Sequence, residues 1–217
     1  MSFLSQGQDE AKNRNRVDNN GEMCEQDFGH GISASVATEE DIDDIANFLR
    51  LFGFPQSDSK TADKIPLYAN PALPLGSYSE TDVRGHLFNY TAAFFGLRVN
   101  GVLSMLLSFR FPLPQFSNTS IMMDVVLSLS PTNTNDSLLS KLLNFAFDCL
   151  PRISIMECTK VKVLVLKDSE ESSTICEMFK INGFVEESTL RDEFGPKRDV
   201  VIYSRWFSPQ PHTEREK

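Results

Sequence analysis

The stretch from Ile121 to Leu150 constrains the fold of this chain more than any other. It opens with a short apolar run rich in β-branched residues, which is typical of a buried strand. Pro131 ends that strand because proline has no N–H for a sheet ladder. A polar loop, 132–137, separates the strand from a second apolar segment. The stretch therefore predicts a strand, a tight turn and a helix.

The helix is predicted from apolar residues that recur at three- and four-residue spacing, namely Leu138, Leu139, Leu142, Leu143, Ala146, Cys149 and Leu150. Asp136 or Ser137 can cap it, and Pro151 is expected to close it. The first N–H groups of a helix have no internal partner, so this turn offers a place to hold an anion. The alternative is an ordinary strand–helix unit without a binding role.

Composition narrows the class of protein. The chain has 217 residues, 41% of them hydrophobic and 24% charged, with a net charge of −9. No apolar run is long enough to span a bilayer and no signal peptide is recognised, so no membrane role is expected. The acidic balance argues against nucleic acid. It is compatible with a cationic substrate such as an amine, and an acidic solubilising surface explains it equally well.

The cysteines predict neither a disulfide framework nor a metal site, because the four of them (Cys24, Cys149, Cys158 and Cys176) have no paired spacing. Cys149 and Cys176 fall on apolar helix faces and are expected to be buried small side chains. A reducing compartment, cytoplasmic or nuclear, fits best.

Local signals divide the chain into three parts. Residues 1–30 are predicted to be a disordered polar tail, 31–207 a single domain and 208–217 a second polar tail. Two capping boxes, at Thr38–Asp41 and Ser79–Asp82, each open a helix. The remaining elements are a strand at 32–37, a loop at 54–78, a hairpin of 91–99 and 102–111 around Asn100-Gly101, a strand at 161–166, a helix ended by Asn182-Gly183, and strands at 184–186 and 200–203.

This order of elements resembles the GCN5-related N-acetyltransferase (GNAT) superfamily from about Ser33 to Trp206. The segment Met178–Phe184 is similar to the helix end that the family commonly writes Leu-Tyr-x-x-x-Gly-Phe. Leu129-Ser130-Pro131 resembles the family's Val-x-Pro, and Arg198–Arg205 its closing strand. The resemblance implies an α/β fold in which helices flank a central mixed β-sheet.

The resemblance also implies a reaction. Acetyl-CoA would lie against a splayed central strand, with its pyrophosphate on backbone N–H groups before the third helix. An amine acceptor would attack the thioester directly. The acceptor would be a small molecule, a protein N-terminus or a lysine, and the loop 54–78 and the hairpin end would shape its site. A homodimer is compatible with the sequence, which does not fix the oligomeric state.

Carried onto this chain, the cofactor-binding positions are Leu127, Leu129, Thr134, Asn135, Asp136, Ser137, Leu138, Leu139, Ser140 and Ser172. The family's pyrophosphate loop carries Arg or Gln followed by two small residues, and these positions align with Thr134, Ser137 and Leu139. Both glycines are absent. Glycine lets a backbone approach a phosphate closely, so this departure weakens the predicted loop. Asn133 and Asn135 tolerate the left-handed conformation and can partly substitute.

The predicted catalytic residue is Asp124, which is the only carboxylate on the central strand and could serve as a base directly or through water. The alternative is a hydrogen-bonded or exposed structural aspartate. Phe179 stands where the family often has a tyrosine that protonates the leaving thiolate. By analogy with the family, the predicted function is an acyl-CoA-dependent N-acetyltransferase. The alternatives are a GNAT-fold binding or regulatory module without catalysis and an unrelated α/β domain.

Overall fold

The computed structural model describes residues 15–17, 23–52, 79–111, 120–127, 133–153, 160–167, 170–193, 196 and 199–206. The predicted loop 54–78, Leu129 and the predicted tail 208–217 lie outside these ranges. No helix in the described ranges is long and apolar enough to cross a membrane.

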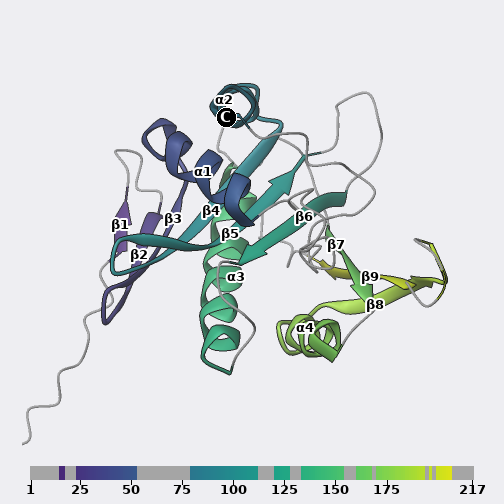
Figure 1. Cartoon of the computed structure of the whole chain (residues 1–217). Coiled ribbons are helices and arrows are strands. Elements are labelled where there is room, and N and C mark those ends of the chain that lie inside the picture. The colour runs from purple at the N-terminus through teal and green to yellow at the C-terminus, as the bar shows by residue number, and fades with distance from the viewer. Residues whose placement is uncertain are drawn as a thin grey trace, which may run out of the picture.

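Nine strands of the described ranges form one mixed sheet at the centre of the fold, in the order β1-β2-β3-β4-β5-β6-β7-β9-β8 (Figure 1). Each neighbouring pair is antiparallel except β6 with β7. The predicted α/β class with a mixed sheet is therefore confirmed. The strands are β1 (Asn15–Val17), β2 (Met23–Gly29), β3 (Ile32–Val36), β4 (Ala92–Val99), β5 (Val102–Arg110), β6 (Ser120–Leu127), β7 (Lys160–Lys167), β8 (Val185–Leu190) and β9 (Asp199–Trp206).

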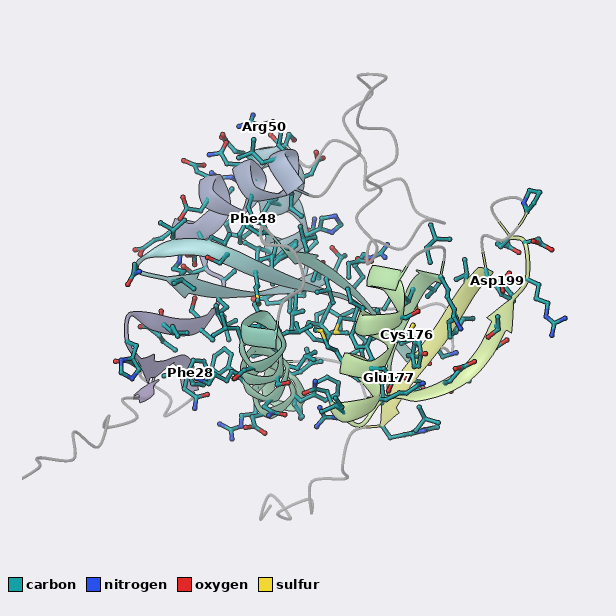
Figure 2. All side chains as sticks on the ribbon, turned by 60° about the horizontal axis from the view of Figure 1, so that its bottom comes forward. Phe28, Phe48, Arg50, Cys176, Glu177 and Asp199 are labelled. Carbon is teal, nitrogen blue, oxygen red and sulfur yellow. The ribbon has the colours of Figure 1, made fainter. Side chains whose placement is uncertain are left out.

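In the part of the chain that the structure describes, four α-helices and one short 3-10 helix cover the two faces of this sheet (Figure 1). α1 and α2 pack through Ile45 and Val83 on one face, and α3 and α4 pack through Leu142 and Phe179 on the other. Figure 2 shows that α1 has an apolar side and a polar side. Phe48 points towards the sheet, whereas Arg50 points away from it. The helices are η1 (Glu39–Asp41), α1 (Ile42–Phe52), α2 (Glu80–Phe88), α3 (Asn133–Ile153) and α4 (Glu170–Ile181).

The sheet begins earlier in the chain than the sequence predicts. β2 pairs antiparallel with β3, and β1 pairs with β2, so both belong to the central sheet. The prediction of disorder over residues 1–30 is wrong for these strands. Polar residues make up much of both strands, and this composition hides the strand signal in the sequence.

The hairpin around Asn100-Gly101 is confirmed. β4 pairs with β5 from Ala92↔Arg110 to Val99↔Val102. Asn100 and Gly101 have φ values of 52° and 81°, the positive values that a two-residue type I′ turn requires. The turn and a register shift between Leu97 and Arg98 together determine which side chains of β5 face α1 and α2.

The start of the first helix is joined to the sheet. Asp41 accepts the backbone N–H of Thr38 at 2.9 Å, as the predicted capping box requires. Arg98 on β4 donates to Asp41 at 2.9 Å and to Asp44 at 2.8 Å. Arg98 thus ties the acidic first turn to β4.

The end of α4 forms a Schellman motif. The N–H of Phe184 donates to the carbonyl of Phe179 at 2.9 Å, and the N–H of Gly183 donates to Lys180 at 3.0 Å. The rings of Phe179 and Phe184 lie 5.2 Å apart and supply the apolar contact of the motif. Gly183 has a φ of 78°, which confirms the predicted helix end.

Two glycine substitutions are expected to change stability in opposite directions. Gly183→Ala should lower the free energy of unfolding by about 1–2 kcal/mol, because alanine is strained at positive φ. Gly85→Ala should raise it by roughly 0.5–1 kcal/mol, since Gly85 lies inside α2 and an added Cβ meets no atom within 4 Å among the described residues. Urea unfolding of both variants measures the difference, and equal effects of one sign would contradict the argument.

Helix α3 is longer than predicted. It begins at Asn133, not at 137 or 138, and continues to Ile153 with Pro151 inside its last turn. The predicted loop 132–137 is therefore wrong for 133–137, which are helical. Several residues before Leu138 can cap a helix, so composition alone does not identify the first turn.

Candidate functional site

The central strands β6 and β7 separate along their length. They pair in parallel only at Ser120↔Lys160, Ile121↔Val161 and Met122↔Lys162. Beyond this point β6 continues to pair with β5 as far as Leu127, and β7 with β9 as far as Lys167. The arrowheads of β6 and β7 point apart in Figure 1. We call this opening, between 123–127 and 163–167, the splay.

Backbone groups make the splay a candidate binding site. In a continuous sheet, alternate residues of β6 would place their N–H and C=O groups in a ladder with β7. No such ladder is recorded between 123–127 and 163–167. Buried backbone groups need partners, and an extended ligand with amide groups can supply them. The splay is therefore a candidate site for a strand-like molecule.

The first turn of α3 follows β6 closely in the sequence. In a helix that begins at Asn133, the N–H groups of 133–136 have no partner four residues back. Thr134, Asn135 and Asp136 lie in this turn, and the structure describes their backbone. Anion-binding N–H groups are thus expected at 133–136.

The prediction for residues 137–140 needs correction. Their N–H groups fall in the second turn, where the helix itself supplies acceptors at 133–136. Leu138 and Leu139 are 8% and 1% exposed and belong to the core beneath α3. The hydroxyl of Ser140 accepts from Asn182 Nδ2 at 3.0 Å and so joins α3 to the end of α4. Ser137 is exposed.

The other predicted cofactor positions are placed only in part. Leu127 is the last residue of β6 and pairs with Met105 of β5. Ser172 lies in the first turn of α4. The structure describes the backbone of both residues. Both residues remain predicted binding positions.

Asp124 lies on β6 at the closed end of the splay, on the sheet face that α1 and α2 cover. It is 1% exposed. Arg110 on β5 faces both of its oxygens: Nη2 donates to Oδ1 at 2.9 Å and Nε lies 2.8 Å from Oδ2. The predicted catalytic carboxylate is thus a buried ion pair, and Arg110 is a site residue that the sequence did not reveal.

Two further polar side chains lie around this pair. Ser108 is opposite Asp124 in the ladder, 4% exposed, and its Oγ has no hydrogen-bond partner in the described part of the chain. His86 of α2 bonds Thr91 through Nδ1 at 2.8 Å. Burial lowers the pKa of His86; the charge of Arg110 also lowers it, and Asp82 opposes the shift. His86 is therefore neutral at pH 7.

This histidine predicts a pH effect on stability. Because the folded pKa of His86 is lowered from about 6.5, the unfolded chain takes up a proton more readily as pH falls below that value. The contribution of His86 to the free energy of unfolding is therefore lost as the pH is lowered. The melting temperature should fall less between pH 7.5 and pH 5 for His86→Gln than for wild type, measured by calorimetry. Parallel curves would show that His86 titrates normally.

The position expected to hold a proton donor on α4 carries none. Phe179 is 0% exposed and stacks on Tyr203 with ring centroids 6.2 Å apart. Tyr203 lies beneath α4 with its hydroxyl 3.5 Å from Glu186. Burial is the largest cause that raises the pKa of Tyr203, and a hydrogen bond with Cys176 is the second. The hydroxyl of Tyr203 is therefore a weak acid here. Cys149 and Cys176 are buried, as predicted.

Comparison with known proteins identifies the fold. No protein-family model matches the sequence, and no curated protein matches it. Solved structures do match. An acetyltransferase of the GNAT family from Streptococcus pneumoniae aligns with a TM-score of 0.59 at 14% identity, covering 82% of this chain and 99% of that one.

Two other structures agree. The protein yncA of Salmonella typhimurium, solved with its cofactor acetyl-CoA, aligns with a TM-score of 0.56 at 13% identity, covering 86% of this chain and 99% of that one. The ribosomal-protein-S5-alanine acetyltransferase of Vibrio fischeri aligns with a TM-score of 0.54 at 12% identity, covering 85% and 97%. The chain therefore has the fold of the GCN5-related N-acetyltransferases.

Proposed function

We propose that this protein is an N-acetyltransferase that uses acetyl-CoA and an amine acceptor. The observation that carries the proposal is the splay, where β6 leaves β7 after Met122. Acetyl-CoA has an extended arm with two amides, and such an arm fits a strand edge that lacks a ladder partner. The structural neighbours support the same chemistry, since one of them was solved with acetyl-CoA.

The residues present fit this co-substrate in two places. Backbone groups of Met123–Leu127 would pair with the amides of the arm, and the N–H groups of 133–136 would face its diphosphate. Leu127, Thr134, Asn135 and Asp136 keep their predicted binding role through the backbone. The absence of loop glycines bears less on this arrangement, because the first turn of any helix presents free N–H groups.

The co-substrate would supply an activated thioester. The acceptor nitrogen would attack the carbonyl carbon, the C–N bond would form as the C–S bond breaks, and the nitrogen would lose a proton. A backbone N–H of β6 that points into the splay would stabilise the developing negative oxygen. With phenylalanine at 179, the thiolate would take its proton from water.

The sequence predicts Asp124 as the catalytic base, but its surroundings favour a different role in the reaction. A base must come within hydrogen-bond reach of the proton that it removes. Arg110 faces both oxygens of Asp124, whose side chain is 2% exposed. We therefore propose that Asp124 acts as a positioning residue that holds Arg110, and that water carries the acceptor proton away.

Transfer assays with the Asp124→Asn variant separate these roles. We would follow thiol release from acetyl-CoA with a panel of amines and identify the products by mass spectrometry. A positioning role predicts a raised KM for the acceptor and a pH–rate profile of unchanged shape. Loss of the basic limb of that profile, with a large fall in kcat, would restore Asp124 as the base. A protein that releases no thiol with any amine would contradict the acetyltransferase proposal.

A second candidate is a GNAT-fold binding module without catalysis. The buried Phe179 favours it, because the common proton donor of the family is absent and Tyr203 is turned towards Glu186. Binding of the co-substrate without thiol release would support this module. The binding partner of this module would then lie at the splay, where the acceptor of an active enzyme would bind.

A further inference from the structure

We infer that the acceptor carries a carboxylate besides its amine, and that Arg110 and Lys162 bind this carboxylate. The inference rests on the proposed function, because it names the class of molecule that would serve as the acceptor. Arg110, Met122 and Lys162 provide the geometry. Met122 pairs with Arg110 on one side and with Lys162 on the other, so the three residues form one row across β5, β6 and β7.

This row lies where the splay begins. Met122↔Lys162 is the last pair between β6 and β7, so the row crosses the sheet at the closed end of the opening. The Arg110 and Lys162 backbones are two strand spacings apart, roughly 10 Å. Both side chains are long enough to reach over Met122. Cα partners in a sheet point to the same face, so both cations lie on the face opposite α3 and α4.

Arg110 is oriented for recognition. Asp124 engages Nε and Nη2, and no described residue accepts from Nη1. The side chain of Arg110 is 17% exposed, whereas that of Asp124 is 2% exposed, so the accessible part of the pair belongs to Arg110. A guanidinium held on one edge loses little further freedom when its other edge binds a carboxylate.

The neighbouring strands supply the second cation. Lys160 is occupied, because its Nζ lies 2.5 Å from Glu187 and 4.8 Å from the centre of the Trp206 ring. Lys162 contacts the same carboxylate only at 3.6 Å, and its side chain is 31% exposed. Lys162 can therefore turn towards a ligand while Lys160 keeps Glu187 paired.

The surrounding charge favours an anion. Arg110, Lys160 and Lys162 face two carboxylates, Asp124 and Glu187, so the row and its neighbours carry one net positive charge on a chain of net charge −9. The diphosphate of the co-substrate would lie elsewhere, at the start of α3 beyond the open end of β6. A second anion, on the acceptor, explains a cationic row at the closed end.

Direct binding tests the inference without relying on catalysis. The probes are α- and β-amino acids, each paired with its carboxamide, titrated by NMR into the full chain saturated with desulfo-CoA and into the free chain. We expect at least one acid to bind roughly tenfold to a hundredfold more tightly than its amide, as a charge-assisted contact implies. If no acid binds more tightly than its amide, the inference is wrong.

Variants locate the preference. Arg110→Gln is combined with Asp124→Asn so that no buried charge is left unpaired, and this pair should abolish the preference. Lys162→Gln should reduce it about tenfold. The control is Arg98→Gln. Arg98 lies at the end of β4 that is far from Arg110, and it is already paired with Asp41 and Asp44. This variant should therefore keep the preference for the acid over its amide.

The outcomes distinguish the two proposals. A preference that survives in the Arg110 and Asp124 double variant overturns the inference. Acids that bind selectively while desulfo-CoA does not would refute the acetyltransferase and keep the carboxylate site. Desulfo-CoA that binds while acids and amides bind alike would refute the carboxylate site alone.

Discussion

Replacing Arg110 by leucine is expected to lower the free energy of unfolding by about 3–5 kcal/mol. The substitution leaves Asp124 at 1% exposure without the guanidinium that now faces both of its oxygens. A carboxylate in that position must stay charged in an apolar layer or take up a proton, and both are costly. Urea unfolding followed by circular dichroism measures the loss.

The double variant Arg110→Met/Asp124→Leu is the matched control. Removing both charges leaves no uncompensated group, so we expect a change within about 1 kcal/mol of wild type, or a gain. Arg98→Met is the second control, since its partners Asp41 and Asp44 are more exposed than Asp124 and lose less when unpaired. If Arg110→Leu costs no more than Arg98→Met, the pair is not a buried ionic contact.

Leu139→Ala is expected to lower the free energy of unfolding by about 2–5 kcal/mol. Leu139 is 1% exposed in the core between α3 and the sheet, so truncation loses apolar burial and leaves a cavity. The position aligns with a small residue of the family's phosphate loop, and this alignment suggests that a smaller side chain would open an anion site. The structure predicts otherwise, because Leu139 lies in the second helical turn.

Ser137→Ala is the matched control for Leu139→Ala. Ser137 lies two residues earlier on the same helix and is exposed, so its change tests helix propensity without a cavity and should stay within about 0.5 kcal/mol. Both variants should bind desulfo-CoA no more tightly than wild type. A gain in affinity for Leu139→Ala at unchanged stability would show that this leucine blocks the site instead of supporting the core.

Short sequence motifs correctly predicted a turn and a helix end, because the conformation of these features depends mainly on neighbouring residues. The Asn100-Gly101 turn gives the hairpin because few other dipeptides adopt two positive φ values. Gly183 ends α4 for a similar reason. The overall order of strands and helices then follows, and the GNAT fold could be predicted from the sequence although no family model matches it.

The site was harder to predict because it depends on pairing between distant strands. Asp124 was identified as the carboxylate of the central strand, but its partner Arg110 follows from the register of β5 against β6. The sequence between those strands carries no two-residue turn signal like Asn100-Gly101, so the register cannot be read from the chain. The row of Arg110, Met122 and Lys162 needs a second register, between β6 and β7, and was missed for the same reason.

Hydrogen exchange with and without desulfo-CoA tests the central claim most directly, because it reports both binding and its place. The account predicts slower exchange of the amides of Met123–Leu127 on β6 and of 133–136 at the start of α3 when desulfo-CoA is present. Strand β2, at the far side of the sheet, serves as the internal reference and should not change. Unchanged exchange in both segments at millimolar desulfo-CoA, or protection confined to other elements, would contradict the claim that the splay holds the co-substrate.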